Sequence, residues 1–380
     1  MTMAADKQDK VLNVPTLRFP EFQEEWACNH LKEHLSVNKE RNKDNRFSKK
    51  DVLSVSGEVG IVNQIELLGR SFAGKEVSDY HIVKKGNVVY TKSPLKEFPY
   101  GIIKVNRGTD GIVSTLYAVY DVLDNTDGRF IEYYFANKDR INRYLKPIVR
   151  IGAKHDMKIG NEEVLLNTIK IPSYYEQKRV SDFLDIISKR IETQSRIIEK
   201  LQSLIIGLEQ ILLKTQSDWR TCYIGDVLSI GSGKDYKHLS EGNIPVYGTG
   251  GYMLSVNDFL YDGDSVCIGR KGTIDKPIYL QGRFWTVDTL FYTHDFRGIL
   301  PRYCYYLFQT INWQMYNEAS GVPSLSKDTI ERIMIAIPDI EEQEKTCLVL
   351  DSVTQKISLE ESYLSKLQQQ KSYLLSTMFI

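Results

Sequence analysis

Apolar residues recur at every seventh position in two long stretches of this chain. The first stretch carries them at Leu184, Ile191, Ile198, Ile205 and Leu212. This spacing is typical of a helix that packs lengthwise against another helix. No proline interrupts the chain from about Tyr175 to Thr215. We therefore expect a continuous helix there, roughly 57 Å long at 1.5 Å per residue.

A second stretch repeats the pattern 166 positions later. The residues predicted to pair the helices are Leu184, Ile187, Ile191, Ile198, Leu201, Ile205, Leu208 and Leu212 in the first stretch, and Leu350, Val353, Ile357, Leu364, Leu367 and Leu374 in the second. Gln194 is a polar exception among the apolar residues of the first stretch. Glu360 and Lys371 are polar residues that narrow the apolar stripe of the second stretch. Further apolar residues at Ile197, Leu204 and Ile211 widen the first stripe beyond a two-stranded seam, which suggests that another protein packs there.

Each helical stretch follows the same short apolar segment, which predicts a strand that ends in proline. The first copy runs from Ile169 to Pro172 and the second from Ile335 to Pro338, and each is followed by Glu-Gln. Further back, Tyr133-Tyr134 matches Tyr305-Tyr306, and Trp26 matches Trp219. Between the Trp and the Pro the second copy is 27 residues shorter, so the copies differ in their loops. Repetition at this period indicates two copies of a whole domain with its helix.

The repeat predicts an α+β fold with two similar globular domains, a pair of long antiparallel coiled-coil helices and an internal pseudo-two-fold. Antiparallel pairing is expected because the first helix enters the second domain and the second helix leaves it. The expected parts are a flexible tail over 1–13, domain one over 14–173, helix one over 174–216, domain two over 217–338 and helix two over 339–380.

Lysine and arginine are concentrated in the first domain, although the whole chain of 380 residues has no net charge. Residues 39–50 carry six basic against two acidic residues, and residues 138–158 carry seven against two. Residues 220–338 carry eleven against twelve. Nucleic-acid-binding domains are commonly basic, so only the first domain has the expected electrostatic pattern.

Five widely spaced cysteines without a CxxC pair suggest neither a disulfide framework nor a zinc knuckle, and a reducing cytosol fits best. The first thirteen residues are polar and charged, and no apolar run reaches 18 residues. We therefore expect no signal peptide and no membrane span. These features favour a cytoplasmic protein.

The sequence contains no complete motif of a zinc protease, a phosphate-binding loop or a methyltransferase. His30-Leu31-Lys32-Glu33-His34 fits the inverted zinc-protease pattern, but the second copy has no histidine there and no third ligand follows. Gly231-Ser232-Gly233-Lys234 resembles the end of a phosphate loop, yet Leu228 and Asp235 occupy positions that require Gly and Ser or Thr. A methyltransferase would need a glycine-rich turn and an Asn/Asp-Pro-Pro-aromatic loop, and neither occurs. We expect no catalytic residues and no metal site.

Loops that combine basic, aromatic and glycine residues remain as candidate DNA contacts. Lysine and arginine neutralise phosphates, and several polar side chains read base edges in the major groove. In the first domain the candidates are Lys39, Arg41, Lys43, Arg46, Lys92, Ser93, Lys96, Tyr100, Arg150, Lys154 and Lys158. In the second domain they are Lys234, Lys237, His238, Tyr247, Thr249, Arg270, Lys271, Ser324 and Lys327.

Several blocks of the sequence resemble the specificity subunits of type I restriction-modification systems. The blocks are Val14 through Trp26, Val83 to Tyr90, Ile244 to Gly248, Pro172 to Gln177 and Pro338 to Gln343. The resemblance covers the chain from about residue 14 to 380. It rests on the order of these blocks, duplicated around two long helices, rather than on any single block.

The resemblance implies two target recognition domains that each read one half of a split DNA sequence, with the paired helices fixing the spacing. It also implies partners: two adenine methyltransferase subunits on the helices and, optionally, two motor-nuclease subunits. S-adenosylmethionine, ATP and Mg would then belong to those partners. The alternatives are a non-catalytic scaffolding adaptor whose twin domains bind polypeptides, and a catalytic chain with an unrecognised site.

Overall fold

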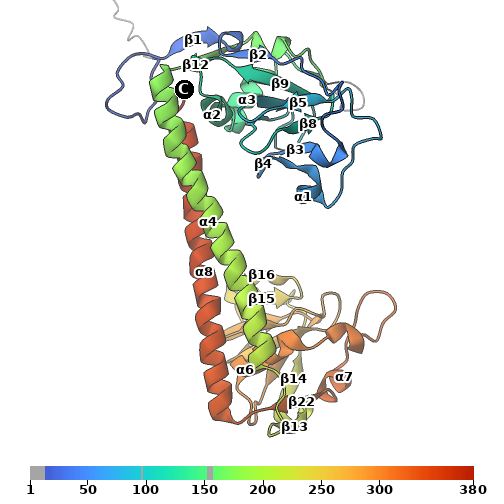
Figure 1. The fold of residues 1–380 in the computed structure, drawn as a ribbon. Helices are drawn as coiled ribbons and strands as arrows, with labels where there is room; N and C mark the ends of the chain where they lie inside the picture. The colour runs from blue at the N-terminus through green and yellow to red at the C-terminus, as the bar shows by residue number, and fades with distance from the viewer. Residues whose placement is uncertain (1–12, 96, 152–156) are drawn as a thin grey trace, which may run out of the picture. The chain divides into compact units, whose positions relative to one another are not determined.

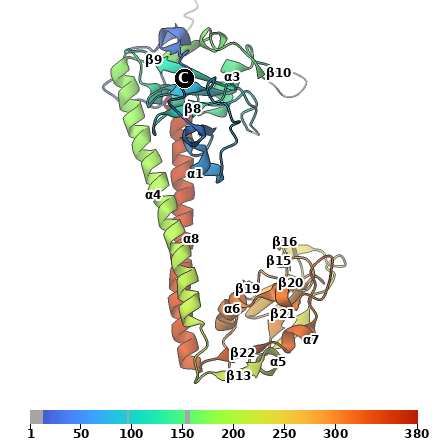
Figure 2. The same cartoon turned by 45° about the vertical axis from the view of Figure 1, so that its right-hand side comes forward.

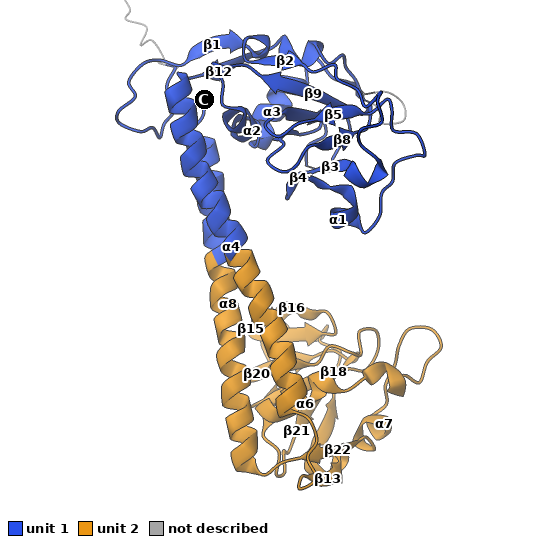
Figure 3. Cartoon of the chain, in the orientation of Figure 1, with its two compact units in different colours: residues 1–193, 364–380 blue, residues 194–363 orange. Residues whose placement is uncertain are grey.

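The computed structural model describes residues 13–95, 97–151 and 157–380 (Figure 1). The chain divides into two compact units (Figure 3). Unit 1 comprises Met1–Thr193 with Leu364–Ile380, and unit 2 comprises Gln194–Tyr363. This division cuts both long helices, so each unit contains part of each helix, whereas the five-part division expected from the sequence keeps the helices apart from the domains. The expected tail, 1–13, lies outside the described residues except for Asn13.

Unit 1 is built mainly from short antiparallel strands. Its elements before the long helix are β1 (Ala27–His30), η1 (Leu31–Glu33), β2 (Leu35–Val37), η2 (Lys49–Asp51), β3 (Leu53–Ser56), β4 (Gly60–Asn63), α1 (Gln64–Leu68), β5 (His81–Val83), β6 (Val88–Thr91), β7 (Ile103–Val105), β8 (Gly111–Val113), β9 (Tyr117–Val122), α2 (Gly128–Tyr134), α3 (Lys138–Leu145), β10 (Arg150–Ile151), β11 (Met157–Lys158), η3 (Glu163–Leu165) and β12 (Thr168–Ile171). Strands β2, β9, β6 and β7 form a four-stranded sheet in that order, and β1 pairs with β12.

Unit 2 repeats this plan. Its elements between the long helices are β13 (Arg220–Tyr223), α5 (Ile224–Val227), β14 (Ser229–Ser232), β15 (Glu241–Gly248), β16 (Gly251–Val256), β17 (Tyr261–Asp262), β18 (Ser265–Gly269), β19 (Ile278–Leu280), β20 (Arg283–Thr286), β21 (Leu290–His294), α6 (Pro301–Thr310), η4 (Trp313–Tyr316), α7 (Lys327–Glu331) and β22 (Met334–Ile337). Strands β14, β21, β18 and β19 form a sheet in the same order as β2, β9, β6 and β7, and β13 pairs with β22 as β1 does with β12. A second sheet, β16-β15-β20-β17, completes unit 2.

A buried glutamine ties each long helix to its own domain. Gln177 donates from Nε2 to the carbonyl oxygen of Pro172 at 3.0 Å and accepts from the backbone N–H of Asp127 at 3.0 Å. Gln343 makes the same pair of bonds in unit 2, to the carbonyl of Pro338 at 2.9 Å and from the N–H of Leu300 at 2.8 Å. The repeated Glu-Gln of the sequence is therefore a structural junction.

Exchanging Gln177 for leucine is expected to destabilise unit 1 by about 2–4 kcal/mol. The leucine keeps the volume but removes the partner of the buried Pro172 carbonyl and that of the half-buried Asp127 N–H. A buried group without a partner costs about 1–3 kcal/mol. Urea unfolding of Gln177→Leu against Gln202→Leu, a control at an exposed helix position, measures the difference. Equal midpoints for the two variants would contradict the role of this junction.

A hydrogen bond that occurs in both units shows that the two tyrosine pairs align one residue away from the sequence match. Tyr133 bonds to the Asp185 carboxylate at 2.7 Å, and Tyr306 bonds to that of Asp351 at 2.5 Å. Tyr133 is therefore equivalent to Tyr306, and the expected pairing of Tyr133 with Tyr305 is wrong. Two adjacent tyrosines occur in both copies, and sequence alone does not show which one faces the helix.

The long helices are α4 (Tyr174–Leu212) and α8 (Ile340–Thr377). In unit 1 the start of α4 packs with the end of α8, and in unit 2 the end of α4 packs with the start of α8 (Figures 1 and 2). The helices are thus antiparallel in both units, and the predicted α+β fold with two similar domains and paired long helices is confirmed. None of the residues predicted to pair them is exposed. The polar exception Gln194 is buried and donates to the backbone carbonyl of Glu360 at 3.2 Å.

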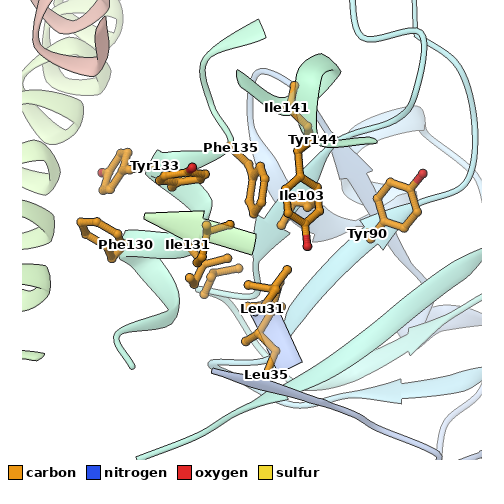
Figure 4. Packing of buried hydrophobic residues seen from close by; sticks show 14 of the residues in the cluster. Leu31, Leu35, Tyr90, Ile103, Phe130, Ile131, Tyr133, Phe135, Ile141 and Tyr144 are labelled. Atoms are coloured by element: carbon orange, nitrogen blue, oxygen red, sulfur yellow. The ribbon is translucent and has the colours of Figure 1, made fainter. Parts of the chain in front are cut away.

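The end of α8 completes the main core of unit 1. Leu374, Met378 and Phe379 are at most 5% exposed and belong to the cluster formed around Phe130 and Trp26. Figure 4 shows part of that cluster, with aromatic rings from α2 and the following segment above the aliphatic side chains of Leu31 in η1 and Leu35 in β2. The chain's final residues therefore stabilise its first domain. Among the residues that the structure describes, no helix has the length and apolarity needed to cross a bilayer.

Candidate nucleic-acid interface

Unit 1 has a cavity of about 480 Å³ at one end of its four-stranded sheet. The cavity is lined by Val37, Asn38, Lys39, Arg41, His81, Gly160, Asn161, Glu162 and Glu163. Two of the predicted DNA contacts, Lys39 and Arg41, therefore line the same cavity. The lining mixes cations, amides and carboxylates, so it offers hydrogen-bond donors and acceptors together.

Lys92, a third predicted contact, lies beside this cavity at the end of β6. Its Nζ donates to Oδ1 of Asn161 at 2.6 Å. Burial and the nearby Arg41 lower the pKa of the Lys92 ammonium, whereas Glu163 acts in the opposite direction. The positive charges of Lys92 and Arg41 thus lie close to each other, and Glu163 offsets their repulsion only in part. This arrangement favours a ligand that carries electron-rich atoms.

His81, on β5, lies against the same cations. Its side chain is only 3% exposed, and its Nδ1 has no hydrogen-bond partner in the described structure. Burial, followed by Arg41 and Lys92, lowers the pKa of the imidazole to about 4. The ring is therefore neutral at pH 7, with one nitrogen as donor and the other as acceptor.

Because the pKa of His81 is lower in the folded than in the unfolded chain, where it is near 6.5, protonation favours the unfolded state. Above about pH 6.5 His81 is neutral in both states and should not lower the free energy of unfolding. As the pH falls from 6.5 to 4, the unfolded chain binds a proton at His81 that the folded chain does not, and the free energy of unfolding should decrease. We expect His81→Asn to lose less stability than the wild type between pH 7 and pH 4.5 in urea unfolding. The exposed His238→Asn is the matched control, and an unchanged pH dependence in His81→Asn would contradict burial as the cause.

Unit 2 gathers four predicted contacts at the end of β18. Arg270 follows the strand, and its carbonyl accepts from the N–H of Leu325 at 2.9 Å. Lys271 forms an isolated β-bridge with Ser324. A Cβ placed on Gly272 would lie 3.6 Å from Oγ1 of Thr249, so the loop after β15 reaches the same corner. The guanidinium of Arg270 lies 5.9 Å from the centre of the Phe291 ring.

The other predicted contacts lie elsewhere. Lys43 forms an ion pair with Asp79, and Arg46 pairs with Glu40 at 3.1 Å, so both charges already have carboxylate partners. Arg150 and Lys158 lie opposite each other in the β10–β11 hairpin. Lys234, Lys237 and His238 belong to the loop between β14 and β15, where the His238 ring lies 5.7 Å from that of Trp285. The structure also places Ser93 in an exposed loop and Tyr100, Tyr247 and Lys327 at half-buried positions; Lys96 and Lys154 lie outside the described residues.

The sequence missed the residues that complete the unit 1 cavity, namely Asn38, His81 and Asn161. They come from three loops or strand ends far apart in the chain, and none belongs to a charge cluster or motif. Asn161 carries the clearest function, because its side chain holds Lys92 and its carbonyl accepts from the Tyr120 hydroxyl at 2.9 Å. Only the folded chain brings these residues together.

The His-x-x-Glu-His segment has a structural role. His34 Nδ1 is 2.7 Å from Oγ1 of Thr126, and His30 Nδ1 bonds to the carbonyl of Leu166. No three His, Cys, Asp or Glu side chains in the described part of the chain are grouped to hold a metal ion. The glycines of Gly231-Ser232-Gly233 serve packing, because a Cβ on Gly231 would lie 2.1 Å from the Tyr292 ring.

Comparison with known proteins shows which family this chain resembles. Residues 216–369 match the model of the type I restriction modification DNA specificity domain. This segment is similar to the specificity domain of type I restriction-modification systems. It covers the unit 2 domain and most of α8, and the resemblance of the chain to specificity subunits is confirmed. The unit 1 domain has the same sheet order and the same helix junction.

Two specificity subunits are similar to part of this chain. The chain is 22% identical over 139 residues to the EcoprrI type I restriction enzyme specificity subunit of Escherichia coli, covering 34% of each chain. It is 24% identical over 118 residues to a putative type I specificity subunit of Haemophilus influenzae, covering 30% of this chain and 31% of the relative. The matched stretch therefore spans about a third of these relatives.

Solved structures show the same fold over nearly the whole chain. The type I restriction-modification S subunit from M. genitalium superposes with a TM-score of 0.65 at 17% identity, covering 97% of this chain and 99% of that one. A chain from a study of complex assembly and conformational transition of the type I R-M system gives 0.55 at 15% identity, covering 93% and 97%.

Proposed function

We propose that this chain is a DNA-recognition subunit whose two domains each read one half of a split target sequence. The observation that supports this most directly is the internal repeat. Both domains have the same four-stranded sheet, and in both the end of an inner strand carries predicted DNA contacts: Lys92 after β6 in unit 1, and Arg270 and Lys271 after β18 in unit 2. Lys39 and Arg41 follow the edge strand β2 of the unit 1 sheet. Two similar readers in one chain suit a target of two separate parts.

The second domain need not be strongly basic. When two weak readers are linked, binding of the first raises the effective concentration of the second, so modest contacts suffice in each. The long helices then fix the distance between the half-sites. Zero net charge also limits trapping on DNA of the wrong sequence, since non-specific binding is mainly electrostatic.

The chain directs adenine methylation and restriction through partner subunits and has no catalytic role of its own. Apolar residues outside the helix seam support a protein partner: Ile197, Leu204 and Ile211 are 39%, 48% and 70% exposed on α4. We assign this stripe to an adenine methyltransferase subunit, two copies of which bind the chain, with two motor-nuclease subunits as optional partners. S-adenosylmethionine, ATP and Mg belong to those subunits, and the complex works in the cytoplasm.

A selection experiment tests the proposal. The chain is purified with its co-expressed methyltransferase subunit and offered a library of random DNA duplexes. We expect the bound fraction to contain two short blocks of fixed bases separated by an unspecified spacer of one length. A stable complex that enriches no sequence would contradict the proposal and favour the scaffolding alternative.

A further inference from the structure

Lys92 and Arg270 occupy the same position in the two repeats. Lys92 is the first residue after β6, which lies between β9 and β7, and Arg270 is the first residue after β18, which lies between β21 and β19. The Lys92 N–H donates to the carbonyl of Leu116 at 3.0 Å, and the Arg270 N–H donates to that of Thr289 at 2.8 Å. Leu116 and Thr289 each immediately precede the neighbouring strand of the sheet, β9 or β21.

A second contact supports this equivalence from another part of the chain. Asn161, which accepts from Lys92, lies two residues before η3. Leu325, which donates to the carbonyl of Arg270, lies two residues before α7. Each residue thus lies at a corner built from the same three segments, with a side-chain contact at Lys92 and a backbone contact at Arg270. The sequence does not reveal this match, because the loops that form the corners differ in length.

The surroundings of these cations suit a base edge better than a phosphate. Glu162 and Glu163 line the unit 1 cavity, where Glu162 lies 3.6 Å from Nζ of Lys39 and Glu163 accepts from the N–H of Gly160 at 2.8 Å. In unit 2 the N–H of Glu318 donates to the carbonyl of Ser324 at 2.9 Å, so the backbone of this acidic residue adjoins the bridge to Lys271, and its carboxylate accepts from the Ser326 and Thr329 hydroxyls. Carboxylates repel phosphates but accept from the amino groups of bases. Each cation also has a restricted direction, Lys92 through Asn161 and Arg270 through the Phe291 ring. Directional contacts select bases, whereas phosphate contacts position the protein.

We infer that Lys92 and Arg270 are equivalent specificity-determining residues, each donating to the O6 and N7 acceptors of a guanine, Lys92 in one half-site and Arg270 in the other. The inference rests on the proposed function and adds which residue in each domain reads a base, and which base it reads. Lysine and arginine are both suited to this guanine edge in the major groove.

Four variants of the purified complex with its methyltransferase subunit test the inference: Lys92→Met, Arg270→Met, and the controls Lys85→Met and Lys276→Met. The control lysines are exposed and lie in the same two domains, outside the corners. Library selection gives the base preference at every position, and binding to the selected duplex at several salt concentrations gives the number of phosphate contacts.

We expect Lys92→Met to reduce the preference for guanine about 10- to 100-fold at one position of one half-site, and Arg270→Met to do so at one position of the other half-site. The salt dependence should not change. Lys92→Arg copies the residue of unit 2 and should retain the guanine preference, which distinguishes lost readout from a misfolded corner. The control variants should select the wild-type sequence.

Uniform weakening across all sequences, with a salt slope smaller by about one, would assign these cations to phosphates and overturn the inference. An unchanged selected sequence, or loss of preference in the same half-site for both variants, would also overturn it. In each case a wild-type complex that still selects a split sequence leaves the proposed function standing. A wild-type complex that selects no sequence would overturn the proposed function and this inference together.

Discussion

Replacing Phe379 with alanine is expected to destabilise unit 1 by about 3–5 kcal/mol, the usual cost of removing a large aromatic side chain from a core. Phe379 is 4% exposed, and its ring centre lies 5.1 Å from that of Phe130 and 6.3 Å from that of Trp26. The guanidinium of Arg140 lies 5.2 Å from the same ring. The second-last residue of the chain is therefore a central part of the first domain's core.

Amide hydrogen exchange shows which unit loses stability in Phe379→Ala. In Phe379→Ala the amides of β6 and β9 should exchange faster, whereas those of β18 and β21 should keep their wild-type rates, because the lost contacts belong to unit 1. Tyr373→Ala, at a 60% exposed position of the same helix, should leave both sets unchanged. Equal protection of β6 in Phe379→Ala and the wild type would show that the C-terminus does not support that domain.

Exchanging residues 14–172 for the corresponding domain of a related chain should change one half of the recognised sequence completely and leave the other half intact. The segment suits exchange because its first and last strands pair with each other, Ala27 opposite Ile171 across β1 and β12. The donor must keep the surface that receives Phe379 and the backbone N–H that Gln177 holds, since both contacts come from outside the exchanged segment.

Sequencing of modified adenines in cells that carry the chimera and the methyltransferase subunit reads both halves at once. The reciprocal exchange, of residues 217–338, is the matched control and should change only the opposite half. If either chimera altered both halves together, the two domains would not read independently.

The two similar domains and the paired helices were predictable because the sequence repeats itself. Heptad spacing places the paired helices, and the duplicated strand, proline and Glu-Gln place the junctions at Gln177 and Gln343. Apolar periodicity reports which face of an element is buried, and it survives changes in loop length. The sequence therefore predicts those parts of the fold that are marked by a regular apolar spacing or by a duplicated segment.

The local chemistry was much less predictable. Lys43 and Arg46 look like free cations in the sequence, yet both have carboxylate partners in the fold. His81 and Asn161 carry no signal in the sequence, but they line the same cavity as Lys39 and Arg41. Such neighbours come from different loops, and their meeting depends on sheet geometry that a single sequence does not specify.

The central claim is that two domains in one chain read two separated parts of one DNA target. The most direct test is to sequence every modified adenine in a cell that carries only this chain and its methyltransferase subunit. The account predicts one split motif, with both parts required and a spacer of constant length. Methylation at a single continuous motif, or at adenines that share no motif, would contradict it.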